Sequence, residues 1–270
     1  MQPTQEPSQY TEAQTRGSMD SALSRSNMDG FQSGGRAWDP LRPDLTELLK
    51  SAKQADVQPI YYGSNHTFLV TLDGGEAGIS YAVYKPSRGE YPLYDFPTGT
   101  LYRREIGSYL VSAVLGWELV PATVRTTGPF GEGSLQIFIE SVNSGEILLD
   151  DLRRLALLDL ILNNADRKGE HCLIGDNEKL WGIDHGLTFH PQPKLRTVLW
   201  HFAGSPIPEE DSRGLQTFLG ALRGLAGDQV CELRELISAP EWRALVTRVD
   251  RLASARTFPD PRYKPVPYRW

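Results

Sequence analysis

The chain has 270 residues, 40% of them hydrophobic, and a formal net charge of −6 at pH 7. This length suits one large domain or two small lobes with a substantial core. The negative charge argues against broad, sequence-independent binding of nucleic acid, which depends on Lys and Arg neutralising phosphates, but it leaves room for a local basic pocket that binds a small anion.

The N-terminal segment, residues 1–38, is rich in Gln, Ser, Gly, Thr and Met and has almost no regularly spaced aliphatic residues. A segment of this composition buries too little apolar surface to offset the entropy lost on ordering, which predicts a disordered tail. A short helix opened by Asp44 is expected next.

The chain after this tail first predicts a small antiparallel β-sheet with one helix. The strands are expected where β-forming residues cluster: 59–62, 67–72, 78–84, 117–126 and 134–142. Asp73-Gly-Gly75 is typical of a hairpin turn, and the Pro- and Gly-rich residues 86–99 predict a loop. Apolar positions spaced three and four apart predict an amphipathic helix over 101–115 that ends at Gly116.

The second half of the chain predicts mainly helices. Residues 148–162 are apolar on most helical faces, and the loop 162–172, with the sequence LNNADRKGEHC, follows this run. Short strands at 171–174 and 180–183 predict a hairpin. Three more helices are expected near 212–225, 228–237 and 241–255.

The order of these elements predicts an α+β fold with two lobes. Residues 39–140 would form the N-terminal lobe, a β-sheet with one helix, and residues 141–270 a mostly helical C-terminal lobe. A cleft between two such lobes is a common binding place for a nucleotide.

Neither secretion nor membrane insertion is predicted. No apolar run approaches about 18 residues, the length of a membrane span, and the N-terminus lacks the apolar region of a signal peptide. The two cysteines, Cys172 and Cys231, each lie in an apolar segment and form no CxxC pair, so neither a zinc site nor a disulfide framework is indicated. We therefore expect a cytoplasmic protein with no transmembrane segment.

Several charged residues match the parts that phosphoryl transfer from ATP requires: a lysine on the phosphates, a carboxylate that orients it, and further carboxylates for the acceptor hydroxyl and for Mg²⁺. Lys85 ends the third predicted strand, and Glu105 lies in the first turns of the next helix. Either residue alone has a plain explanation, as an exposed strand charge or as an acid near a helix N-terminus. Together, in the order of a two-lobed protein-kinase-like fold, they predict a Lys–Glu pair that holds the lysine for ATP.

Two further carboxylates follow the long apolar helix. Asp166 lies in the loop after it with Lys168 two residues on, and Asp184 follows a buried strand and precedes Gly186, which permits a sharp turn. We expect Asp166 to act as the base that orients the acceptor hydroxyl, and Lys168 to bind the γ-phosphate. Asp184 would bind the Mg²⁺ that bridges the β- and γ-phosphates.

Three further residues are candidates for contacts with the nucleotide. Ser64 and Asn65 lie in the turn between the first two strands, where they could contact phosphate oxygens, although a plain hairpin turn explains them equally well. Glu140 ends the strand that leads to the second lobe, where backbone groups could meet adenine; a plain core strand is the alternative.

Two segments, 159–167 (DLILNNADR) and 183–189 (IDHGLTF), resemble the catalytic and metal loops of phosphatidylinositol 3-/4-kinase-like proteins. The resemblance is closest to the type II 4-kinases and to an uncharacterised actinobacterial branch. Three further segments, 84–86, 104–110 and 119–123, resemble in turn the family's strand with the lysine, the helix that follows it and the next strand. The resemblance implies a protein-kinase-like fold that uses ATP and Mg²⁺ or Mn²⁺.

The chain departs from this family in two ways. The family usually has Asn five residues after the catalytic Asp as a second metal ligand, and here that residue is His171. Because imidazole suits softer ions than Mg²⁺, we expect a preference for Mn²⁺ or a single-metal site. The chain also has no basic amphipathic helix that would bind a membrane, which disfavours a phosphoinositide acceptor. Similar loops occur in protein kinases of the toxin and secretory types.

The sequence therefore predicts an ATP-dependent kinase that moves the γ-phosphoryl group to a hydroxyl on a lipid, a small molecule or a protein. Two alternatives stay open. His171 and the turn 63–66 between the first two strands, which has a single glycine, also fit a pseudokinase, a regulatory module that binds nucleotide without turnover. An enzyme that transfers AMP from an inverted nucleotide would use the same loops.

Overall fold

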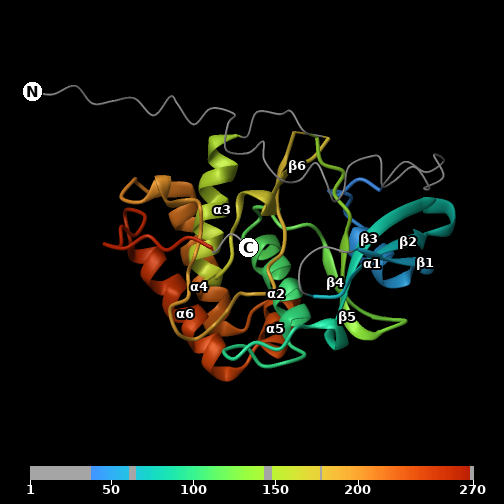
Figure 1. Ribbon diagram of the computed structural model, residues 1–270. Coiled ribbons are helices and arrows are strands. Elements are labelled where there is room, and N and C mark those ends of the chain that lie inside the picture. Colours follow the sequence, from blue (N-terminus) through green and yellow to red (C-terminus); the bar gives the residue numbers. More distant parts are fainter. Residues whose placement is uncertain (1–37, 61–64, 143–147, 177, 268–270) are drawn as a thin grey trace, which may run out of the picture. The chain divides into compact units, whose positions relative to one another are not determined.

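The computed structural model describes residues 38–60, 65–142, 148–176 and 178–267 (Figure 1). The chain divides into residues 1–34 and a compact unit of residues 35–270, and the described residues all belong to the second. The predicted N-terminal tail lies outside the described residues apart from its last residue, Trp38.

A five-stranded antiparallel sheet with the strand order β1-β2-β3-β5-β4 forms one part of the fold. Its strands are β1 (Lys53–Ile60), β2 (Thr67–Asp73), β3 (Ile79–Pro86), β4 (Thr123–Gly128) and β5 (Gly131–Ile137). Because β3 is the central strand, Lys85 near its end is not a charge on an edge strand. The alternative explanation of Lys85 from the sequence analysis is therefore excluded. Lys85 stands opposite Ser134 of β5.

Two strands begin six residues away from the predicted position. The first begins at Lys53 instead of residue 59, because β1 is a polar edge strand without apolar alternation, a position that tolerates charges and Pro59. The fourth begins at Thr123 instead of residue 117. Glu118 has a left-handed backbone with φ 51°, and Pro121 lacks the N–H that a strand would use, so the chain cannot pair before this point.

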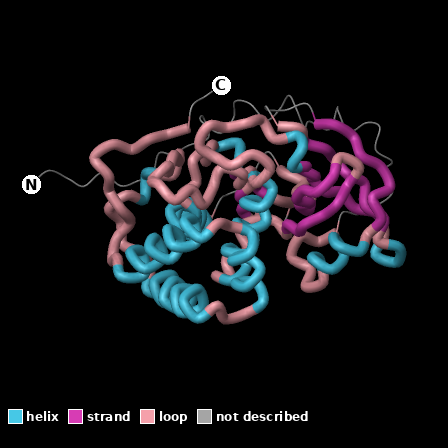
Figure 2. The backbone as a smooth tube through the Cα atoms, turned by 90° about the horizontal axis from the view of Figure 1, so that it is seen from below, coloured by secondary structure: helices cyan, strands magenta, loops and turns pink. Residues whose placement is uncertain are grey.

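The rest of the described chain is mainly helical, with helix ends within about three residues of those predicted. The helices are α1 (Leu45–Ser51), α2 (Leu101–Val114), α3 (Leu149–Leu162), α4 (Glu209–Gly224), α5 (Asp228–Leu236) and α6 (Ala239–Ser254). A short antiparallel hairpin of β6 (Cys172–Ile174) and β7 (Leu180–Gly182) follows α3. In Figure 2 the strands of the sheet and most of the helices form separate groups. The predicted α+β fold, an antiparallel β lobe plus a helical lobe, is thus confirmed.

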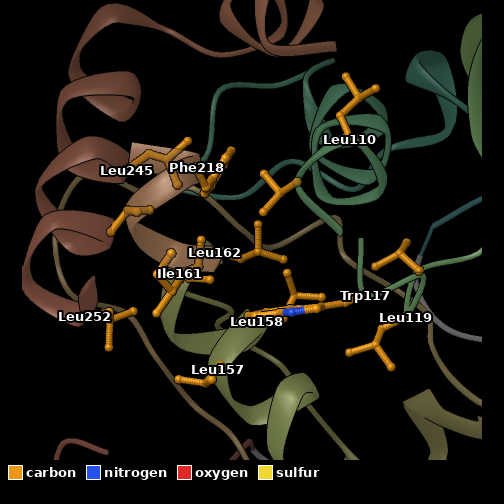
Figure 3. Close-up of a cluster of buried hydrophobic side chains, with 14 of the residues drawn as sticks. Leu110, Trp117, Leu119, Leu157, Leu158, Ile161, Leu162, Phe218, Leu245 and Leu252 are labelled. Carbon is orange, nitrogen blue, oxygen red and sulfur yellow. The ribbon is translucent and has the colours of Figure 1, made fainter. Parts of the chain in front are cut away.

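Helix α2 connects the two parts, because it contacts β4 and β5 of the sheet and also α5. The main apolar core lies among the helices, and Figure 3 shows Ile161 and Leu162 of α3 in one cluster with Phe218 of α4 and Leu245 of α6. These four side chains are at most 1% exposed. Among the described residues, no helix is both long and apolar enough to cross a membrane.

Helix α6 begins with a capping box. The backbone N–H and the hydroxyl of Ser238 both donate to Oε2 of Glu241, at 2.8 and 2.7 Å. We expect Ser238→Ala to lower the free energy of unfolding by about 1 kcal/mol, measured by urea denaturation, because an unsatisfied helix N-terminus is left. The matched control is Ser212→Ala within α4, where alanine favours the helix and no loss is expected.

Candidate active site

The side chains of Lys85 and Glu105 meet between β3 and α2. The ammonium of Lys85 donates a hydrogen bond to Oε1 of Glu105, whose side chain is only 4% exposed. It also donates to Oδ1 of Asp184 at 2.9 Å. The other oxygen of Glu105, Oε2, accepts from the backbone N–H of His185 at 2.8 Å. The structure therefore joins the sheet, α2 and the loop after β7 at the Lys85 ammonium, which pairs with both Glu105 and Asp184.

Asp184 has an unusual backbone conformation. Its φ of 58° lies in the left-handed region, which is costly for a residue with a side chain and often occurs at functional sites. The sequence suggested that Gly186 would make the sharp turn, but Asp184 itself makes it. The carboxylate of Asp184 is half-exposed, and its second oxygen, Oδ2, lies 3.3 Å from Nε2 of His171.

Asp166 and Lys168 lie beside this pair. The ammonium of Lys168 lies 3.1 Å from Oδ2 of Asp166. Potential ligand atoms of Asp166, His171 and Asp184 all lie within 4.8 Å of one another, which makes these three residues a candidate metal site. The structure thus brings together the two carboxylates that the sequence placed eighteen residues apart.

The charged groups of the site shift one another's pKa values. The Lys85 ammonium holds the pKa of Asp184 well below its usual range. Burial acts to lower the pKa of Lys85, but Asp184 and Glu105 outweigh it and raise that pKa above its ordinary value. Burial lowers the pKa of His171 to about 4, so its imidazole is neutral near pH 7. Burial also raises the pKa of Asp166, against the opposing effect of the Lys168 ammonium.

A buried ion pair beneath the site was missed by the sequence reasoning, in which Asp159 and Arg167 occurred only as the ends of the segment 159–167. The guanidinium of Arg167 and the carboxylate of Asp159 on α3 are both fully buried, with Nε 3.1 Å from Oδ1. Asn164 and Thr197 also donate to this carboxylate, at 2.9 and 3.1 Å. A carboxylate at position 159 within an otherwise apolar helix was the available signal, because a buried charge requires a partner.

The structure says less about the remaining candidates for nucleotide binding. Ser64 lies outside the described residues. The side-chain oxygen of Asn65 accepts from the backbone N–H of Tyr91 at 2.7 Å, which ties this turn to the loop before α2. Glu140 is exposed and comes three residues after β5 ends, on the segment that leads to α3. Their roles stay predictions.

This sheet, these helices and this placement of the lysine and carboxylates define a protein-kinase-like fold. The Golgi casein kinase is similar to the chain, with 13% sequence identity and a TM-score of 0.54 over 78% of this chain and 74% of that chain. A structure of the Golgi casein kinase with Mn/ADP bound gives 15% identity and a TM-score of 0.55 over the same shares. At this identity the likeness shows the fold alone. The finer resemblance to phosphatidylinositol kinases stays a prediction.

The chain belongs to the same family as Protein Rv2133c of Mycobacterium tuberculosis. The two are 37% identical over an alignment that covers 84% of this chain and 96% of that protein. No protein-family model matches the chain.

Proposed function

We propose that this protein is a metal-dependent kinase that transfers the γ-phosphoryl group of ATP to a hydroxyl acceptor. The observation that carries the proposal is the convergence of Asp166, His171 and Asp184 around one point, with Lys85 bonded to Asp184. The kinase fold adds support, since the Golgi casein kinase of the same fold has been crystallised with Mn and ADP. The cleft between the two lobes, predicted to divide near residue 140, would hold the nucleotide.

The residues present fit a divalent cation. Nδ1 of His171 lies 3.0 Å from the carbonyl oxygen of Asp166, an acceptor only, so Nδ1 carries the proton of the neutral ring. The lone pair of Nε2 therefore faces Oδ2 of Asp184 at 3.3 Å, and two electron-rich atoms repel each other unless a cation lies near both. A ring nitrogen fixed by a hydrogen bond at the opposite nitrogen is the usual arrangement of a metal-binding histidine. His171 and Asp184 would hold the ion, which leaves Asp166 beside them for the acceptor hydroxyl.

The protein groups can carry out the transfer in a single displacement. Lys85, held by Glu105, would bind the phosphates and offset their charge. Asp166 would accept a hydrogen bond from the acceptor hydroxyl and take its proton as the acceptor oxygen bonds to the γ-phosphorus. The bond from the γ-phosphorus to the leaving oxygen breaks, and ADP departs. Lys168, beside Asp166, would move onto the transferred group. A bound cation would supply Lewis-acid stabilisation of the phosphate charge.

Labelled ATP tests the reaction. The purified chain would be incubated with Mn²⁺ and ATP labelled at the γ- or the α-phosphate, alone and with protein, lipid and small-molecule extracts. We expect label from the γ-position, and not from the α-position, to appear on an acceptor. Transfer of the α-label would instead identify an AMP-transferring enzyme. Binding of ATP and Mn²⁺ without transfer of either label would identify a pseudokinase.

His171 should set the choice of metal. Because imidazole suits Mn²⁺ better than Mg²⁺, we expect higher activity in Mn²⁺ at saturating ATP, and His171→Asn to shift the Mn²⁺/Mg²⁺ activity ratio toward Mg²⁺. A shift of about tenfold corresponds to roughly 1.4 kcal/mol. The exposed His201 gives the matched control, since His201→Asn should leave the ratio unchanged. Equal or higher wild-type activity in Mg²⁺ would contradict this prediction.

A further inference from the structure

The buried guanidinium of Arg167 contacts both segments that carry the candidate metal ligands. Its Nη1 donates to the carbonyl oxygens of His171 and Ile183, at 3.1 and 3.0 Å. Its Nη2 lies 2.6 Å from Nε2 of His185, which serves as the acceptor because arginine only donates. One side chain thus joins the backbone of one candidate ligand, His171, to residues on both sides of another, Asp184.

These contacts lie on either side of a residue with an unfavourable backbone conformation. Asp184 has its left-handed φ of 58° between Ile183 and His185. A conformation of this kind persists only where the surroundings hold it. Ile183 is held by Arg167 at its carbonyl oxygen and by the carbonyl of His171 at its N–H, at 2.9 Å. His185 is held by Arg167 at its ring and by Glu105 at its N–H.

The ion pair with Asp159 fixes the guanidinium itself. Nε of Arg167 donates to both carboxylate oxygens of Asp159, at 3.1 and 3.2 Å, and Asp159 belongs to the rigid helix α3. The remaining nitrogens therefore point in set directions. A planar, five-donor fork can serve Asp159, two carbonyls and a ring nitrogen together, whereas a lysine ammonium at the same place cannot.

We infer that Arg167 is a positioning residue for the metal site: it fixes the separation of His171 and Asp184 and holds the left-handed turn at Asp184. This inference rests on the proposed function, since it assigns the cation to these residues. It predicts that losing the fork weakens metal binding by more than the loss of stability explains.

Binding of Mn²⁺, followed by electron paramagnetic resonance in the presence of saturating ADP, tests the inference without requiring turnover. We expect Arg167→Lys to weaken Mn²⁺ binding about 10- to 100-fold, the usual effect of losing a group that orients metal ligands. The control is Leu245→Ala in the core of α6, which destabilises the fold but should keep Mn²⁺ affinity within about twofold of wild type. Equal affinities of Arg167→Lys and wild type would overturn the inference.

A second pair of variants keeps the test decisive if Arg167→Lys does not fold. His185→Leu removes the acceptor of Nη2, whereas His185→Gln can place an oxygen near the position of Nε2. We expect the Leu variant to lose Mn²⁺ affinity and the Gln variant to keep most of it. Equal affinities of the two variants would count against a positioning role. Failure of the wild-type chain to bind Mn²⁺ with ADP would instead contradict the proposed function.

Discussion

Asp184→Asn is expected to reduce phosphoryl transfer by about 1,000-fold or more while the protein stays folded. The carboxylate of Asp184 is the candidate ligand that lies between Lys85 and His171, and an amide provides neither its charge nor its second anionic oxygen. Stabilisation of the phosphate charge by a metal ion contributes several kcal/mol to such reactions, which corresponds to about three orders of magnitude in rate. The measurement is the initial rate of transfer from γ-labelled ATP in Mn²⁺.

The same substitution at an exposed carboxylate provides the control. Asp176 lies in the turn between β6 and β7, eight residues before Asp184, and its side chain is exposed. Asp176→Asn should therefore leave the rate within about twofold, since an exposed turn charge affects a nearby site only weakly through screened electrostatics. If Asp184→Asn kept more than a tenth of wild-type activity, the assignment of this residue to the metal would be wrong.

Much of the arrangement was predictable because the relevant signals are local. The hydrophobic periodicity of the long helices and the turn residues of the hairpins set the order of elements. The two-lobed α+β fold followed from that order, and the resemblance of segments 159–167 and 183–189 implied its protein-kinase-like form. The contact between Lys85 and Glu105 was predicted as well, because a lysine at a strand end and an acid in the next helix match the order of a two-lobed kinase.

What could not be predicted depends on contacts between distant segments. Arg167 lies in the polar loop 162–172, where a cation is usually exposed, and only the fold shows that it meets Asp159 of α3 and the carbonyl of Ile183. The left-handed turn at Asp184 was equally hidden, because local propensity favours glycine for this conformation and Gly186 is close by. In both cases tertiary contacts override the preference of the isolated segment.

The attachment of α6 to α2 involves another buried ion pair. Nη2 of Arg104 lies 2.6 Å from Oε1 of Glu241, and Nη1 donates to the carbonyl of Thr188 at 2.7 Å. The two charged side chains are 3% and 9% exposed. Burial acts to raise the pKa of Glu241, but Arg104 and the hydrogen bonds from Ser238 outweigh it and hold that pKa below its ordinary value. The charge of Glu241 is therefore stable in the folded state only with its partners.

Arg104→Met should lower the free energy of unfolding by about 3–5 kcal/mol at pH 7, because it leaves the carboxylate of Glu241 buried without its cation. Arg223→Met is the control for the same change at an exposed pair, since Arg223 and Asp250 are 57% and 49% exposed. Its expected cost is below about 1 kcal/mol. A loss at Arg104 no larger than this control would show that the pair with Glu241 contributes little.

The pH dependence of the stability lost in Arg104→Met identifies the cause of that loss. In the wild-type protein the lowered pKa of Glu241 stabilises the folded state above the ordinary glutamate value of about 4.5, and this contribution disappears as the pH falls through the folded-state pKa. In Arg104→Met the buried carboxylate takes up a proton more readily, which relieves its unpaired charge. The difference in unfolding free energy between the two proteins, measured by urea denaturation, should therefore begin to narrow above about pH 4.5 and continue to narrow as the pH falls below it. A difference that stays constant over this range would point to lost packing of the Arg104 side chain against Phe96 as the source of the destabilisation.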